Sequence, residues 1–305
     1  MILFGEHFVV YGVKAVLCAI DKRITVTAEN IPEGKISIKS DIDELEVPLK
    51  KSISKIKSPL KPFYYIAKKM LEKHNQTTGI KITVESEIPS GVGLGSSSAC
   101  CVAGAAAISR LFEETNKEKI LEMAIEAERT IFQNTSGADC TVCTYGGLME
   151  YDKEKGFSQI KSESNFHLVI ANSDIKHSTD KIVANVRKFK EKNEIKFSNM
   201  CKEESELVNH AIAMLKNNDV RKLGKYMQDN QRFLEDIGIS NERLREMIKI
   251  TEETSFGAKI TGAGGGGCII ALTDESNLEK TILKLKERNH ECFSVKIDFR
   301  GLDTF

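Results

Sequence analysis

Residues Ile88–Ala107 read I-P-S-G-V-G-L-G-S-S-S-A-C-C-V-A-G-A-A-A, and this stretch decides the fold. It continues a strand that we predict over Gly79–Ile88, and its Ala-rich second half has good helix propensity. The order is therefore strand, glycine loop and helix N-terminus. A helix N-terminus carries unpaired N–H groups and a positive dipole end, and glycines let a ligand approach the backbone closely. The pattern predicts a cradle for phosphate groups.

The glycine loop matches neither of the two common phosphate-binding loops. No Lys follows the glycines as in G-x-x-x-x-G-K-[ST], and Gly91, Gly93 and Gly95 are evenly spaced, unlike the dinucleotide fingerprint. The alternative interpretation, a plain glycine turn before a buried Ala-rich helix, stays open for this loop taken alone.

The composition is that of an ordinary globular protein. The chain has 305 residues, of which 41% are hydrophobic and 29% are charged, and its formal net charge is zero. We expect about two domains with a sizeable core. Because there is no global basic field, we expect no nucleic acid partner. No apolar run is long enough to span a bilayer and Met1–Val10 does not resemble a signal peptide, so we expect no membrane attachment and a cytoplasmic location.

The pattern of apolar and charged residues changes along the chain. Alternating apolar residues predict strands in the first part, whereas charged segments with helical spacing dominate from Ser178 onward. We therefore expect an α/β (α+β) protein with two domains, 1–160 and 161–305. Asn116 is a candidate N-cap, and Asn134–Thr141 is predicted to be a polar turn. The predicted helices are Phe63–His74, Lys117–Phe132, Thr179–Lys192, Ser198–Lys216, Val220–Glu235, Asn241–Glu253 and Asn277–Arg288.

Two carboxylates follow the glycine loop. Glu128 lies on a predicted helix, and Asp139 lies in the loop after it. Near a phosphate loop, one of them would hold Mg²⁺, which prefers oxygen ligands. The other would receive or orient the proton of a substrate hydroxyl. The alternative is that both are ordinary solvated acids, one on a helix surface and one in a turn.

Two further clusters interrupt apolar segments. Residues 262–267 read G-A-G-G-G-G between apolar strands, which favours close packing of backbone against phosphates or another loop over a flexible linker. Glu6 and His7 interrupt Met1–Val10, an apolar segment that otherwise resembles a strand. A polar ligand is one reason for two adjacent polar groups at such a place.

Taken in order, three motifs resemble the signatures of the GHMP kinase superfamily, and most closely those of its mevalonate kinases. They are G-E-H-F-V-V-Y-G at 5–12, P-S-G-V-G-L-G-S-S-S-A at 89–99 and K-I-T-G-A-G-G-G-G-C at 259–268. The resemblance extends over nearly the whole chain. It implies a two-domain GHMP kinase fold with the active site in the interdomain cleft. It also implies ATP-dependent phosphorylation of the 5-hydroxyl of mevalonate to 5-phosphomevalonate, a step of isoprenoid biosynthesis.

The resemblance also implies roles for single residues. Asp139 would be the catalytic base or orienting group, and Ser97 and Glu128 would hold Mg²⁺. The residues expected at mevalonate are Glu6, His7 and Thr179. The residues expected at ATP are Pro89, Ser90, Gly91, Val92, Gly93, Leu94, Gly95, Ser96, Ser97, Ser98, Gly264 and Gly265. The partners implied are mevalonate and ATP, and a homodimer is compatible with them.

The sequence departs from the family pattern at three places. A Lys commonly stands five residues before the glycine of G-E-H, a position that falls immediately before Met1, so either the chain shown starts after this Lys or the protein lacks it. Cys100 and His177 stand where animal members often have Tyr and Arg. Two alternatives therefore stay open. One is another small-molecule GHMP kinase, such as a phosphomevalonate kinase, and the other is a nucleotide-binding relative without catalysis.

Overall fold

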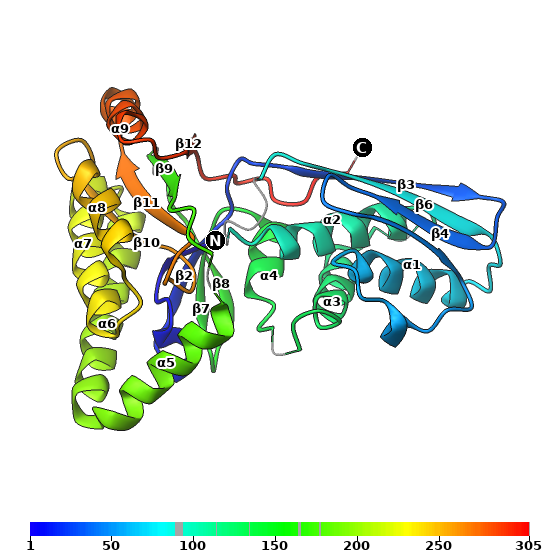
Figure 1. Ribbon diagram of the computed structural model, residues 1–305, viewed down its shortest axis with the longest axis horizontal. Coiled ribbons are helices and arrows are strands. Elements are labelled where there is room, and N and C mark those ends of the chain that lie inside the picture. Colours follow the sequence, from blue (N-terminus) through cyan, green and yellow to red (C-terminus); the bar gives the residue numbers. More distant parts are fainter. Residues whose placement is uncertain (89–93, 114, 134, 164–165, 177, 305) are drawn as a thin grey trace. The chain divides into compact units, whose positions relative to one another are not determined.

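The computed structural model describes residues 1–88, 94–113, 115–133, 135–163, 166–176 and 178–304 (Figure 1). The chain forms two compact units that interleave along the sequence. Unit 1 contains Met1–Asp21 and Gly147–Phe299, whereas unit 2 contains 22–88, Gly95–Gly146 and the C-terminal residues from Arg300. The division predicted at residue 160 is a different partition, because the N-terminal strands group with the C-terminal part of the chain.

In unit 2, helices pack on a sheet with the strand order β3-β6-β4-β5. Strand β4 runs parallel to β6, and the other neighbours are antiparallel. Figure 1 shows α1, α2 and α3 on the same side of this sheet. The inward positions alternate along the strands, so that Ile36, Ile38, Ile80 and Ile82 are fully buried. The elements are β3 (Ile24–Ile31), β4 (Lys35–Lys39), β5 (Glu44–Pro48), the 3₁₀ helix η2 (Ile53–Lys55), α1 (Lys61–Lys73), β6 (Gly79–Ser86), α2 (Ser96–Arg110), α3 (Lys117–Glu128) and α4 (Ala138–Tyr145).

The Ala-rich helix α2 lies at the centre of unit 2. It contacts α1, α3, α4 and β3, and small side chains such as Ala105 and Ala106 let these neighbours approach it. The predicted strand and helix are confirmed, since β6 ends at Ser86 and α2 begins at Ser96, whereas most of the glycine loop between them lies outside the described residues. The predicted cap is confirmed as well, because the Asn116 side chain accepts the N–H groups of Glu118 and Lys119 at the start of α3.

The segment Asn134–Thr141, predicted as a polar turn, contains the start of a helix. Asn134 lies outside the described residues, but α4 begins at Ala138, and Gly137 precedes it as the N-cap residue. The turn prediction is therefore wrong from Ala138 onward. Burial of one face of α4 against α2 and α3 outweighs the weak helix propensity of this short segment. As a result, Asp139 lies in the first turn of a helix.

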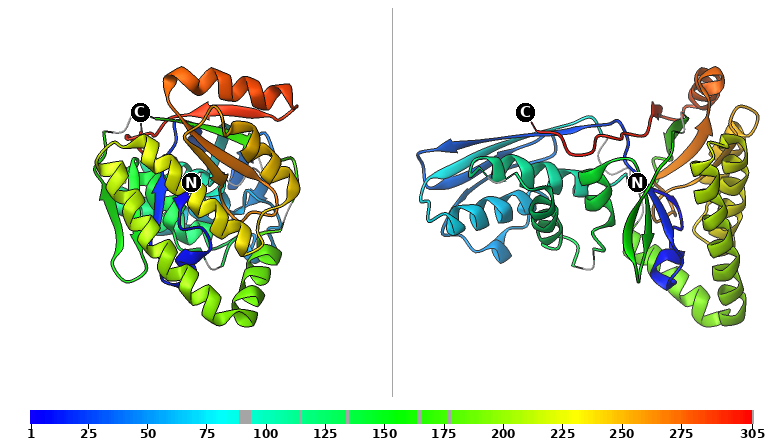
Figure 2. Two further views of the ribbon diagram at one scale, coloured as in Figure 1. Left: turned by 90° about the vertical axis from the view of Figure 1, so that its left-hand side faces the viewer. Right: turned by 180° about the vertical axis from the view of Figure 1, so that it is seen from behind.

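Unit 1 holds two antiparallel sheets in its described part, with the strand orders β1-β2-β7-β8 and β10-β11-β9-β12. Helices α7, α8 and α9 contact the second sheet, and Figure 2 shows α9 lying along β12. The strands are β1 (Ile2–Phe4), β2 (Ala15–Cys18), β7 (Leu148–Asp152), β8 (Gly156–Ile160), β9 (His167–Asn172), β10 (Gly257–Ile260), β11 (Cys268–Thr273) and β12 (Cys292–Val295). The helices are α5 (Thr179–Lys192), α6 (Glu194–Lys216), α7 (Val220–Asp236), α8 (Glu242–Thr251) and α9 (Glu275–Glu287).

The N-terminal segment is a strand over part of its length only. Strand β1 ends at Phe4, and the 3₁₀ helix η1 (Phe8–Tyr11) follows Glu6 and His7. The backbone of His7 has a φ of 62°, a left-handed conformation that no strand continues through. The predicted interruption of the strand at Glu6 and His7 is therefore confirmed, whereas the residues after it form η1 in place of a strand. In the part of the chain that the structure describes, no helix combines the length and apolarity that a membrane span requires.

Candidate active site

The catalytic candidate Asp139 lies against the residue at which the glycine loop enters α2. Gly95 is the N-cap residue of α2 and has a φ of 78°. A Cβ atom placed on Gly95 would come within 3.3 Å of the Asp139 Cγ. The starts of α2 and α4 therefore lie together in unit 2, and the carboxyl group of Asp139 stands beside the backbone of the loop.

The start of α2 presents backbone donors. The first intrahelical bond runs from the Ala99 N–H to the Gly95 carbonyl at 3.0 Å. The N–H groups of Ser96, Ser97 and Ser98 precede it and have no carbonyl four residues earlier within the helix. Together with the positive end of the helix dipole, they form the kind of donor set that binds phosphate.

The structure describes the predicted ATP loop from Leu94 onward. Pro89, Ser90, Gly91, Val92 and Gly93 lie outside the described residues. Leu94, the next residue, is buried. The described part of the predicted loop is therefore its end, where the chain enters α2.

Glu128, the predicted magnesium ligand, is the last residue of α3 and is only 4% exposed. Its two carboxylate oxygens accept hydrogen bonds from the hydroxyl groups of Ser98 and Thr135. The Cys140 thiol lies 3.7 Å from the same carboxylate. Thus the serine that reaches Glu128 is Ser98, one residue after the predicted partner Ser97.

The chemistry of these donors fits Mg²⁺ delivered with a nucleotide. Carboxylate and hydroxyl oxygens are ligands that Mg²⁺ takes, and it commonly uses one or two carboxylates together with substrate phosphates and water. Within the described ranges, no group of three or more His, Cys, Asp or Glu side chains is placed to hold a metal ion. A site built on Glu128 therefore needs the phosphates of the nucleotide to complete it.

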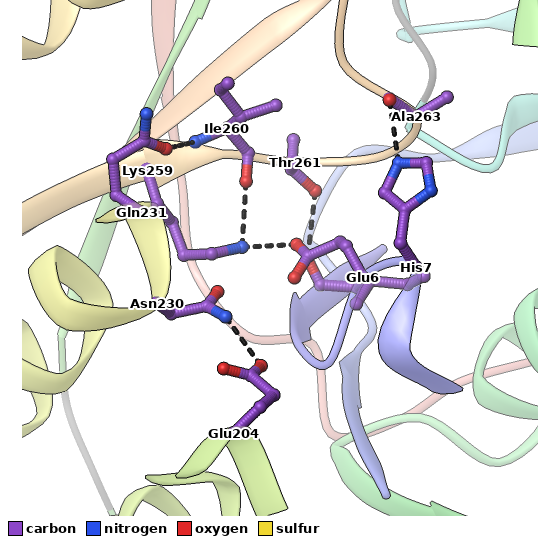
Figure 3. Close-up of polar contacts among 10 residues, drawn as sticks. Glu6, His7, Glu204, Asn230, Gln231, Lys259, Ile260, Thr261 and Ala263 are labelled. Atoms are coloured by element: carbon purple, nitrogen blue, oxygen red, sulfur yellow. Dashed lines mark hydrogen bonds and ion pairs between the residues drawn. The ribbon is translucent and has the colours of Figure 1, made fainter. Parts of the chain in front are cut away.

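In unit 1, the segment of the first motif (5–12) contacts the segment of the third motif (259–268). The His7 Nε2 atom donates to the Ala263 carbonyl at 2.8 Å, although the two residues are 256 positions apart. The carboxylate of Glu6 forms an ion pair with Lys259, and the Thr261 hydroxyl donates to the Ile2 carbonyl at 2.9 Å (Figure 3). Glu6 and His7 are thus held to the strand and loop of the last motif.

The contact of His7 fixes its tautomer. Because a carbonyl can only accept, Nε2 carries the proton. Burial lowers the pKa of His7, so the ring is neutral at neutral pH and Nδ1 keeps a free lone pair. Burial raises the pKa of Glu6 and lowers that of Lys259, and their mutual attraction opposes both shifts.

The glycine run at 262–267 has a defined conformation. Gly264 has a φ of 75°, and a Cβ there would meet the Ile239 carbonyl oxygen at 2.6 Å. The N–H of Gly265 donates to the same carbonyl at 2.7 Å. Only glycine fits this approach to the connection between α7 and α8. The flexible-linker interpretation is therefore wrong for this run.

The predicted site residues form two groups. Asp139, Gly95, Ser98 and Glu128 lie together in unit 2. His7 contacts the loop that carries Gly264 and Gly265 in unit 1. Thr179, the remaining substrate candidate, is the exposed first residue of α5 in the same unit.

Sequence reasoning missed two buried charged residues of unit 1, Lys259 and Glu204. Each leaves a signal in the sequence. Lys259 interrupts the apolar strand Gly257–Ile260, all of which is buried. Glu204 occupies a helical position between Met200 and Leu207 on the buried face of α6, where an apolar side chain is expected.

Comparison with known proteins assigns the family. Residues 61–147 match the model of the GHMP kinases N terminal domain, and residues 211–291 match that of the GHMP kinases C terminal. The first segment lies mostly in unit 2, and the second lies in unit 1. The chain belongs to the GHMP kinases.

Relatives that match over most of the chain include mevalonate kinases. The chain is 34% identical to the mevalonate kinase of Methanothermobacter thermautotrophicus over 99% of its own length and 96% of that protein. It is 34% identical to the mevalonate kinase of Pyrococcus furiosus, with 92% and 88% of the two chains covered. The crystal structure of the Methanococcus jannaschii mevalonate kinase superposes with a TM-score of 0.86 at 30% identity and covers 97% of this chain and 95% of that one.

Proposed function

We propose that this chain transfers the γ-phosphoryl group of ATP to the 5-hydroxyl of mevalonate, giving 5-phosphomevalonate for isoprenoid biosynthesis. The observation that carries the phosphoryl transfer is the position of the Asp139 carboxyl group beside Gly95, where a proton acceptor and phosphate-binding donors lie together. The choice of alcohol rests on relatives that are named mevalonate kinase and that match this chain over most of their length.

Unit 2 supplies the transfer machinery in this proposal. The N–H groups of Ser96, Ser97 and Ser98 bind phosphate oxygens, and the loop before them wraps the same phosphates. Asp139 accepts or orients the proton of the 5-hydroxyl while that oxygen bonds to the γ-phosphorus. The bond from the γ-phosphorus to the bridging oxygen breaks, and ADP leaves with the electron pair. Positioning and charge stabilisation do most of the work in such a transfer.

Glu128 and Ser97 are the proposed magnesium ligands. When bound, Mg²⁺ neutralises charge on the phosphates and helps to hold them in line. The Ser98 and Thr135 hydroxyl groups orient the Glu128 carboxylate through their hydrogen bonds. A ligand whose oxygens are already held in place loses less conformational freedom when the metal arrives.

Unit 1 supplies the contacts to mevalonate. The free Nδ1 lone pair of His7 accepts a hydrogen bond from a mevalonate hydroxyl, and Thr179 offers a second hydroxyl at the exposed start of α5. Glu6, which is also expected at mevalonate, directly precedes His7 in the N-terminal segment. Gly264 and Gly265 complete the phosphate-binding backbone. A cytoplasmic location, a homodimer and the cleft between the domains stay predictions.

A substrate panel tests the proposed function. ADP release with Mg²⁺ and ATP would be measured separately for mevalonate, phosphomevalonate, homoserine and galactose. We expect turnover with mevalonate only, and its loss in Asp139→Ala. Turnover with phosphomevalonate alone would replace the proposed substrate by the phosphorylated one. ADP release independent of any alcohol would contradict the proposal as a whole.

A further inference from the structure

Three ionisable side chains lie buried at the Gly5-Glu6-His7 segment of unit 1. Glu6 is 1% exposed, and Lys259 and Glu204 are fully buried. They come from the N-terminal segment, from β10 and from α6, respectively (Figure 3). Lys and Glu are almost never fully buried unless they are paired or have a specific role. The proposed transfer reaction uses neither Lys259 nor Glu204.

Lys259 joins the first motif to the strand that leads into the third. Its ammonium group donates to the Glu6 carboxylate and, at 2.8 Å, to the Ile260 carbonyl. The Ile260 N–H in turn donates to the Gln231 Oε1 of α7 at 2.9 Å. Glu6 is therefore held through a chain of contacts that ends on a helix and a strand of unit 1.

Glu204 approaches the same segment from α6. The Asn230 Nδ2 atom donates to its Oε1 at 2.6 Å, and the Gly5 N–H faces its carboxyl group. Three oxygens of the cluster have no hydrogen-bond partner among the described residues, namely one each of Glu6, Glu204 and Asn230. Burial raises the pKa of Glu204 to about 8, and the negative charge of Glu6 adds to this shift. This shift favours the protonated form of the Glu204 carboxyl group at neutral pH.

The conformation of His7 needs such support. Its φ of 62° is unfavourable for a residue with a side chain, and its ring is fixed by the contact with Ala263. Strained backbone of this kind persists where the surrounding structure determines it. Glu6 precedes His7 directly and is too deeply buried to touch a ligand without first being uncovered.

We propose that Lys259 and Glu204 are positioning residues, which hold Glu6 and thereby keep His7 in the conformation that presents its Nδ1 to the substrate. The proposal rests on the proposed function for the identity of that substrate. Glu6 then acts through its ion pair with Lys259 instead of by direct contact. The alternative is an ion pair that serves stability alone, since buried pairs are often replaceable by apolar residues.

The first test uses Lys259→Met, which removes the ammonium group and keeps most of the side-chain volume. We expect the KM for mevalonate to rise at least about tenfold while the KM for ATP stays within about twofold. The control is Lys284→Met, which removes the exposed partner of Glu253 in the same unit. Equal KM values for mevalonate in folded Lys259→Met and wild type would overturn the role of Lys259.

Lys259→Met leaves Glu6 buried without its partner and can fail to fold, so a second variant is needed. Glu204→Gln keeps the shape and mimics the protonated carboxyl group. The charged groups around Glu204 are Glu6 and Lys259, and the Cys201 thiol lies nearby on the same helix. We expect the wild-type KM for mevalonate to rise several-fold between pH 7 and pH 9, and this rise to be absent in Glu204→Gln. It should persist in Glu203→Gln, which changes an exposed residue of α6. An identical pH dependence in all three proteins would overturn the role of Glu204.

A readout without substrate separates this proposal from the proposed function. ¹⁵N NMR of the His7 ring, assigned by difference from His7→Gln, reports its tautomer and pKa directly. We expect a neutral ring protonated at Nε2 in the wild type, and a changed tautomer ratio in Lys259→Met at pH 7 and in the wild type at pH 9. A wild type that does not turn over mevalonate but shows these His7 changes would contradict the substrate and support the positioning. An unchanged His7 spectrum in every folded variant and at both pH values would overturn the positioning.

Discussion

The Asp139 carboxyl group lies beside Gly95, because a Cβ added at Gly95 would come to 3.3 Å from the Asp139 Cγ, closer than an ordinary van der Waals contact. Two helix starts meet at this contact, that of α2 at Gly95 and that of α4 at Ala138. The backbone proposed to bind phosphate and the carboxyl group proposed to be catalytic therefore depend on each other for their positions.

Gly95→Ala should lower kcat by about 10²-fold while the protein stays folded. The added methyl group displaces the Asp139 carboxyl group, and misplacement of a reacting group by about 1 Å costs a factor of this size. The positive φ adds strain of about 1 kcal/mol. Steady-state kinetics and thermal unfolding would check both effects.

Gly156→Ala is the matched control for Gly95→Ala. Its φ of 77° equals that of Gly95 within a degree, but no other heavy atom lies within 4 Å of the added Cβ. It should show the strain in its Tm without the loss of kcat. Equal kcat values of the two variants would show that the methyl group does not act through Asp139 and that the positive φ alone accounts for its effect.

Asp139→Asn should reduce kcat by about 10²–10⁴-fold, the range for loss of a positioned general base. Because the amide keeps the shape of the side chain, nucleotide affinity should change by less than about threefold. The control is Asp41→Asn, which alters an exposed acid of unit 2. A kcat near the wild-type value for Asp139→Asn would remove this residue from the catalytic role.

Ser97→Ala and Ser98→Ala should separate metal binding from structural support. Ser98 donates to the buried Glu128, so its loss should lower the free energy of unfolding by about 1–3 kcal/mol. Ser97→Ala should leave stability nearly unchanged and raise the Mg²⁺ concentration needed for half-maximal activity. Chemical denaturation and Mg²⁺ titration of turnover measure the two effects. The reverse result would assign the metal to Ser98.

Glu204 should make the protein less stable as the pH rises. Its pKa is about 8 in the folded state, against the ordinary 4.5. Between these values the unfolded state binds fewer protons than the folded state, so the free energy of unfolding falls with rising pH. The slope is at most about 1.4 kcal/mol per pH unit, and it ends above pH 8. Urea unfolding from pH 5 to pH 9 should show a Glu204→Gln variant that gains stability relative to the wild type as the pH rises. A constant difference over this range would contradict the raised pKa.

Much of the fold could be predicted because its signals are local. The helix Thr179–Lys192 and the strand Cys268–Thr273 lie where periodicity places them. The cap at Asn116 is a contact within three residues. The identity of these residues suffices to predict the structures they form.

The missed features depend on contacts between distant segments. Helix α4 forms because α2 and α3 bury it, and the sequence of the short segment from Ala138 to Tyr145 does not indicate that burial. The pairing of Glu6 with Lys259 joins residues 253 positions apart. The contact of Ser98 with Glu128, in place of Ser97, depends on the rotation of α2, which a motif does not specify.

The structure of the product made from ATP and mevalonate shows whether the 5-hydroxyl is the group that is phosphorylated. A ¹H–³¹P correlation spectrum of the reaction mixture would show to which carbon the new phosphate ester is attached. We expect one new phosphomonoester signal, besides the two phosphorus signals of ADP, that couples to the two protons of C5 and is present in an amount equal to the ADP formed. Inorganic phosphate in place of an ester, or an ester phosphorus without coupling to the C5 protons, would contradict it.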